Sequence, residues 1–136
     1  MPFHLEALAA KHGDALLLHY GPDDAPRLIV IDGGPATVYR NALRPRLNEL
    51  REAYRSRTGL GENAPLPVRL LMVSHIDDDH VHGVLDLMND LVDEQDDGRP
   101  LSCDVETLWH NAFDDLLGNG AEALSASVAG VAGVAG

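Results

Sequence analysis

The order of hydrophobic and polar residues predicts that the chain begins with three β-strands. Short apolar runs at residues 3–9, 15–20 and 27–31 are separated by segments rich in glycine, proline and aspartate. Short runs with turn signals between them are typical of a β-meander, in which neighbouring strands pair antiparallel.

The period of the apolar positions changes at Thr37. From there to about Arg57 they recur every three or four residues with arginines between them, which predicts an amphipathic helix. Thr37 is its candidate N-cap, and the helix should end near Gly59.

Strand and helix signals alternate further along the chain. We expect a buried strand at 68–73, a helix around 84–92 that ends in the acidic run 93–98, and a short strand at 105–109. This order predicts an α/β domain over residues 1–118, with a mixed β-sheet and packed helices. The Ala/Gly/Val-rich residues 119–136 depart from the pattern, and we expect a mobile tail, a linker or the start of a further segment.

The run SHIDDDHVHG at 74–83 carries the strongest chemical signal, directly after the predicted buried strand. Six side chains that can bind metals fall within eight positions: His75, Asp77, Asp78, Asp79, His80 and His82. Imidazole and carboxylate together suit zinc, manganese or iron, and clustered carboxylates repel one another unless a cation lies among them. The run therefore predicts a metal site, with a solvated acidic loop as the alternative.

Charge and cysteine content narrow the function classes. The formal net charge is −12, and from Ser74 onward one basic residue stands against fourteen acidic ones. No broad basic patch is visible, so we expect no strong nucleic-acid-binding surface. A single cysteine, Cys103, excludes an internal disulfide. Without a signal peptide or a membrane-length apolar run, we expect a cytoplasmic protein that does not bind membranes.

Three motifs together resemble a known family. HGDA at 12–15, LIVIDGG at 28–34 and SHIDDDHVHG at 74–83 resemble, in this order, the N-terminal half of the metallo-β-lactamase fold superfamily. The form His-x-Asp-x-Asp-His is similar to the subgroup typified by the hydrolase domain of the ComEC-type DNA-uptake proteins. The resemblance covers roughly residues 3–115.

This resemblance implies the first βα half of an αββα sandwich and a metal-dependent hydrolase. His75 and Asp77 would bind a first metal, and Asp79 and His80 a second, with Asp79 also the catalytic carboxylate. One or two zinc ions are expected, with manganese as the alternative because Asp77 replaces a histidine. Metal-activated water would attack a small-molecule or phosphodiester substrate, nucleic acid included.

Three further residues are candidates to support or line the site. By resemblance, Asp32 would lie beneath it and accept a hydrogen bond from a ligating imidazole. A turn aspartate is the alternative for Asp32, and an exposed histidine at a helix start is the alternative for His82. His110 should lie at a strand end, on the active edge of the sheet.

The resemblance also implies that ligands are missing. Family members bring further histidine and aspartate ligands from the second half of the fold. We therefore expect these 136 residues to belong to a longer chain or to self-associate through an uncovered sheet face. The alternative function is a non-catalytic or incomplete metal-binding or interaction module of the same fold.

Overall fold

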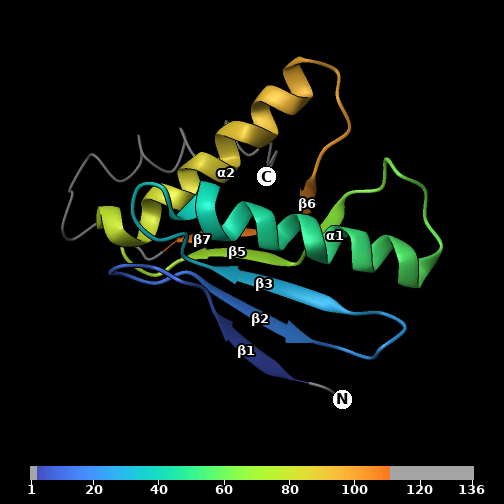
Figure 1. Ribbon diagram of the computed structural model, residues 1–136, viewed down its shortest axis with the longest axis horizontal. Helices are drawn as coiled ribbons and strands as arrows, with labels where there is room; N and C mark the ends of the chain where they lie inside the picture. Colours follow the sequence, from blue (N-terminus) through green and yellow to red (C-terminus); the bar gives the residue numbers. More distant parts are fainter. Residues whose placement is uncertain (1–2, 111–136) are drawn as a thin grey trace.

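The computed structural model describes residues 3–110, which fold as an α/β layer (Figure 1). The strands are β1 (His4–Ala7), β2 (Leu16–Tyr20), β3 (Arg27–Ile31), β4 (Leu66–Val68), β5 (Leu70–Val73), β6 (Cys103–Val105) and β7 (Leu108–His110). The helices are α1 (Arg44–Thr58) and α2 (Asp78–Asp96), and a π-helical turn, Tyr39–Leu43, precedes α1. The predicted tail at 119–136, and with it the boundary after residue 118, lies outside the described residues.

The main sheet is mixed, as predicted, with strand order β1-β2-β3-β5-β7. β1, β2 and β3 pair antiparallel and form the predicted meander. β5 pairs parallel with β3 and with β7. The parallel strands β3 and β5 both end on the side where the loops at Asp32 and Ser74 begin, which brings two of the three motifs to one edge of the sheet.

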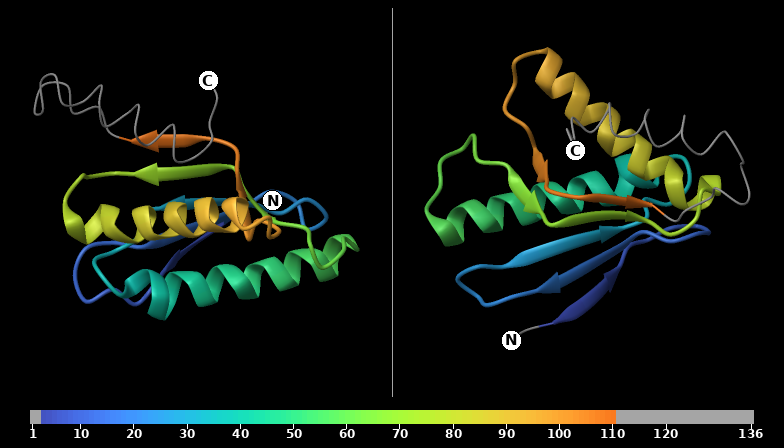
Figure 2. Two further views of the ribbon diagram at one scale, coloured as in Figure 1. Left: turned by 90° about the horizontal axis from the view of Figure 1, so that it is seen from above. Right: turned by 180° about the vertical axis from the view of Figure 1, so that it is seen from behind.

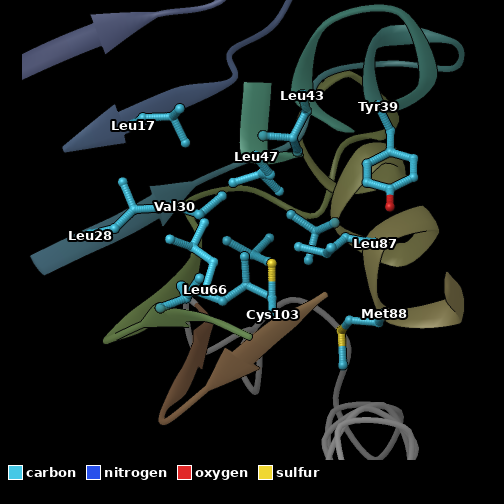
Figure 3. Close-up of a cluster of buried hydrophobic side chains, with 14 residues drawn as sticks. Leu17, Leu28, Val30, Tyr39, Leu43, Leu47, Leu66, Leu87, Met88 and Cys103 are labelled. Carbon is cyan, nitrogen blue, oxygen red and sulfur yellow. The ribbon is translucent and has the colours of Figure 1, made fainter. Parts of the chain in front are cut away.

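Both helices cover the same face of this sheet (Figure 2). Alternate strand residues point toward them, and Leu17, Val30 and Leu71 are all at most 1% exposed. These side chains pack with Leu43 and Leu87 from the helical layer in one continuous core (Figure 3). Burial of this face fixes the register of the strands, because a one-residue slip would turn the core residues outward.

The other face of the sheet is apolar as well. Six half-buried residues form cross-strand rows on this face, and full burial of their side chains would need a covering partner. They are Leu16, Leu18, Ile29, Ile31, Leu70 and Met72. At the ends of the rows, Leu5 is 56% and Trp109 46% exposed. Within residues 3–110, no helix lies on this face (Figure 2).

Two predicted strands are each broken in two. The predicted strand 68–73 is divided at Arg69 into β4 and β5, and the predicted strand 105–109 is divided into β6 and β7. The pairing continues across the break, because Val68 faces Val105 and Leu71 faces Leu108. The buried positions shift phase there, from residues 66 and 68 to residues 71 and 73. The residues on both sides of Arg69 are apolar, so the sequence pattern does not reveal this shift. An Arg69–Glu106 ion pair of 3.0 Å spans the bend.

The helix ends also differ from the predictions. Thr37 does not cap the first helix with its side chain; it adopts φ 76°, and only its main-chain carbonyl accepts a hydrogen bond, from Asn41 N–H at 2.9 Å. At the other end the prediction is confirmed, since Gly59 caps α1 in the left-handed conformation. The second helix ends in the acidic run as predicted, and it begins at Asp78, ahead of its apolar positions, so Asp79 and His80 both lie on its first turn.

No helix within residues 3–110 is long and apolar enough to span a membrane.

Candidate metal centre

Asp32 is the buried centre of the candidate site. It follows β3, is 1% exposed, and donates its main-chain N–H to the Met72 carbonyl at 2.8 Å. Its Oδ1 accepts from the Ser74 N–H at 2.7 Å, and its Oδ2 accepts from the Ser74 hydroxyl and lies 3.0 Å from His80 Nδ1. One carboxylate thus connects the loops after β3 and β5 to the first turn of α2.

The contact with Asp32 orients the His80 ring. A carboxylate accepts hydrogen bonds, so the proton of the neutral imidazole belongs on Nδ1, and Nε2 keeps a lone pair. Nε2 lies 3.7 Å from Asp79 Oδ1. Partial burial disfavours the charged ring, but the hydrogen bond to Asp32 and the charges of Asp32, Asp79 and Asp14 outweigh it and raise the pKa of His80. The negative charge around the ring therefore favours a positive charge at this position.

The four predicted ligands differ in how closely they gather. His75 is exposed, and its ring meets that of His80 edge to face, with centroids 4.9 Å apart. Asp79 is half-buried beside His80. Asp77 is exposed and begins α2: its carbonyl accepts from the N–H groups of His80 and Val81, while its side chain makes no capping bond. His75 and Asp79 thus each contact His80, but within residues 3–110 neither belongs to a group of three donor atoms within 4.8 Å, and Asp77 contributes only through its main chain.

Asp14 joins this group, although the sequence interpretation gave it no ligand role. One donor atom from each of Asp14, Asp32 and His80 lies within 4.8 Å of the others. Asp14 Oδ2 is 3.8 Å from His80 Nδ1, and its side chain is 56% exposed. The available signal was the glycine that precedes Asp14, because a Gly-Asp turn between two predicted strands places a carboxylate at the sheet edge.

Close main-chain contacts hold the three motifs together. Gly34 N–H donates to the Asp14 carbonyl at 2.8 Å, and Gly33 N–H donates to the His80 carbonyl at 2.8 Å. A Cβ at Gly13, which has φ 72°, would overlap the main chain of Asp79. The glycines of these motifs therefore let the loops approach closely enough to surround one point.

His82 and His110 occupy different surroundings. His82 lies on the surface of α2, with Nδ1 2.9 Å from Asp78 and Nε2 3.6 Å from Asp86. The hydrogen bond with Asp78 is the main cause of its raised pKa. His110 is half-buried at the end of β7, where it pairs with Val73, so it neighbours the start of the candidate loop. Of the two, His110 is the better placed to line the site.

A scan against protein-family models and searches of curated proteins and solved structures found no match to this chain. The resemblance of the three motifs to the metallo-β-lactamase superfamily therefore stays a prediction.

Proposed function

We propose that this chain is a metal-dependent hydrolase domain of the metallo-β-lactamase type. The observation that carries the proposal is the 3.0 Å contact between His80 Nδ1 and the buried Asp32, which leaves His80 Nε2 beside Asp79. An imidazole held by a buried carboxylate is the usual arrangement of a metal-ligating histidine. A sheet with both helices on one face also suits the first half of an αββα sandwich.

The donor set fits zinc. Two ligands that each lie about 2.0–2.2 Å from a zinc ion are roughly 3–3.6 Å apart in tetrahedral geometry. His80 Nε2 and Asp79 Oδ1, at 3.7 Å, need only a small side-chain adjustment to reach that spacing. His75, whose ring contacts that of His80 edge to face, is the candidate second imidazole, and the Asp14 carboxylate lies 3.8 Å from His80 Nδ1. The oxygen-rich set also accepts manganese, the alternative ion.

The chemistry follows from these groups. A bound zinc ion lowers the pKa of a coordinated water to about 7, so that hydroxide is available near neutral pH. Asp32 fixes the His80 tautomer, and the half-buried Asp79 carboxylate can orient a water or accept its proton. Such a site suits hydrolysis, and we propose phosphodiesters or small esters as substrates.

Metal content and turnover test this proposal together. The full chain, dialysed against zinc or manganese, should retain stoichiometric metal in elemental analysis and hydrolyse bis(p-nitrophenyl) phosphate. His80→Ala should lose turnover and the metal equivalent bound at this centre. His82→Ala is the matched control, because His82 lies on the same helix but pairs with Asp78 and Asp86. Equal metal content and equal turnover in His80→Ala and the parent protein would refute the proposal.

A non-catalytic metal-binding module is the second candidate. It is favoured by the exposure of His75 and Asp77 and by the engagement of both Asp32 oxygens in hydrogen bonds. Within residues 3–110, His80 and Asp79 are then the two candidate ligands whose side chains are held in place by neighbouring residues. Metal that binds in a His80-dependent way without turnover of any phosphodiester or ester would favour this second function.

A further inference from the structure

A second group of potential ligands lies on the first two strands. His4 and Glu6 belong to β1, and His19 belongs to β2. His4 pairs directly with His19 across the strands, and Glu6 is two residues further along β1, so all three side chains leave the same face of the sheet. One donor atom from each lies within 4.8 Å of the others.

The three side chains lie against one another. The His4 and His19 rings stack with centroids 4.3 Å apart and an angle of 15° between their planes. His19 Nε2 lies 2.9 Å from Glu6 Oε1. Ligands that share one metal ion at about 2.0–2.2 Å are roughly 3–3.6 Å apart. To bind one, the hydrogen-bonded Glu6 and His19 atoms must separate slightly, and the stacked rings must turn so that one nitrogen of each points at the ion.

Arg46 of α1 holds the carboxylate in place. Its Nε donates to Glu6 Oε2 at 2.7 Å, and its Nη1 donates to Glu49 Oε2 at 2.9 Å. Arg46 thereby occupies the oxygen of Glu6 that faces away from His19 and leaves Oε1 directed at the imidazole. A carboxylate fixed by a second residue on its outer oxygen is the support that metal ligands commonly have.

The group is also open on one side. His4, His19 and Arg46 contribute to the wall of a cavity of about 330 Å³, which Tyr54 and Arg57 of α1 also line. Ligand positions that the protein does not fill can therefore be taken by water or a small anion from this cavity.

We propose that His4, Glu6 and His19 bind a zinc ion at a site separate from the candidate centre at His80. Two imidazoles and one carboxylate are a ligand set that zinc commonly takes, with a remaining position for solvent. The two sites lie toward opposite ends of β2, because Asp14 precedes this strand and His19 is near its end. At about 3.3 Å per residue, they are roughly 15 Å apart.

Zinc titration of the full chain after chelator treatment tests this site. His4→Gln and His19→Gln should each lose one zinc equivalent in calorimetry. Glu49→Gln should keep it, because Glu49 shares Arg46 with Glu6 but lies outside the group. His80→Ala should also keep it, whether or not the candidate centre binds metal, so failure of one site is distinguishable from failure of the other.

Histidine ring signals in NMR spectra give an independent readout. Zinc should shift the ring resonances of His4 and His19 in the His80→Ala variant. His4 is exposed, so His4→Gln should fold normally and decides the matter if His19→Gln does not fold. Unchanged zinc stoichiometry in a folded His4→Gln variant, or loss of all zinc binding in His80→Ala, would overturn the proposal.

Discussion

Gly33 and Gly83 lie so close together that neither position has room for a side chain. A Cβ on Gly33 would overlap the main chain of Gly83 and Val84, and a Cβ on Gly83 would overlap the Gly33 carbonyl. Gly83 N–H donates to the Gly34 carbonyl at 3.1 Å across the same contact. The loop after β3 and the first turns of α2 are therefore joined backbone to backbone.

Gly83→Ala should destabilise the protein by about 1–3 kcal/mol, because the added methyl group forces the helix away from the loop. Helix propensity alone would predict the opposite sign, since alanine is better than glycine in a helix by up to about 1 kcal/mol. Urea denaturation measures the free energy of unfolding. Gly61→Ala is the control, because nothing lies within 4 Å of a Cβ there. A Gly83→Ala variant as stable as its parent would contradict the close contact.

Asp32→Asn should weaken zinc binding at the candidate centre by about 10–100-fold, because the amide no longer holds His80 as a carboxylate does. Asparagine tolerates the left-handed conformation of Asp32, at φ 60°, so the loop should keep its shape. Competition with a zinc indicator measures the affinity. Asp86→Asn, which alters the carboxylate 3.6 Å from His82, should leave zinc affinity unchanged. Equal zinc affinities in the parent, Asp32→Asn and Asp86→Asn proteins would show that Asp32 does not support the metal site.

The sheet was largely predictable because its strands obey simple alternation. Leu17 and Val30 point into the core while their neighbours point away, and the turns between the first strands carry glycine and proline. The break at Arg69 was not predictable, because every residue around it is apolar enough to belong to one strand. Only the pairing of β4 with β6 and of β5 with β7 shows where the alternation of buried and exposed residues shifts by one position.

Contacts between candidate ligands were predictable where the residues are close in sequence, and they were not predictable where the residues are far apart. His75, Asp79 and His80 come from one run, and His75 and Asp79 each contact His80. Asp14 reaches His80 from 66 positions away, through a turn with no spacing signal. The contact depends on the approach of Gly13 to Asp79, which is a property of the tertiary fold.

Tyr39 should make stability depend on alkaline pH. It is 7% exposed and donates its hydroxyl hydrogen to Asp90 at 2.6 Å. Burial, the hydrogen bond and the Asp90 charge raise its pKa, whereas an unfolded tyrosine ionises near pH 10. The stabilisation is therefore complete below about pH 10 and is lost as the pH rises through the folded-state pKa.

Tyr39→Phe isolates this contribution. The variant should unfold with a free energy about 0.5–1.5 kcal/mol lower than the parent protein at pH 8, because one buried hydrogen bond is removed. The difference should shrink above about pH 10, because Tyr39 then ionises in the unfolded parent protein and lowers its stability, whereas the variant has no hydroxyl at this position. Urea denaturation at pH 8 and pH 11 measures both values. A difference that grows with pH would contradict the assignment.

Cys103 should be unreactive in the folded protein. It is 2% exposed, and burial, reinforced by the charge of Glu94, raises the pKa of its thiol to about 12. Since the thiolate is the reactive form, reaction with a disulfide reagent at pH 8 should be slow. The same reagent should label the protein at once in guanidinium chloride. Fast labelling of native protein would show that the pair of β4 and β6 opens readily.

The apolar sheet face opposite the helices should cause self-association. Its rows join Leu18 to Leu5 and Met72 to Trp109, and the outer members of both rows are about half exposed within residues 3–110. Covering such side chains is worth about 1.5–3 kcal/mol for each one fully buried. A face of this kind on a soluble domain typically marks an interaction surface.

Light scattering coupled to size-exclusion chromatography tests this expectation on the 136-residue chain. The mass should exceed that of a monomer and rise with concentration. Leu5→Lys combined with Trp109→Lys should shift the protein toward monomer, because each lysine places a charge that is costly to bury on the apolar rows. Leu60→Lys is the matched control, since Leu60 is 49% exposed but lies in the loop after α1. A parent protein that stays monomeric at every concentration would show that this face is already covered.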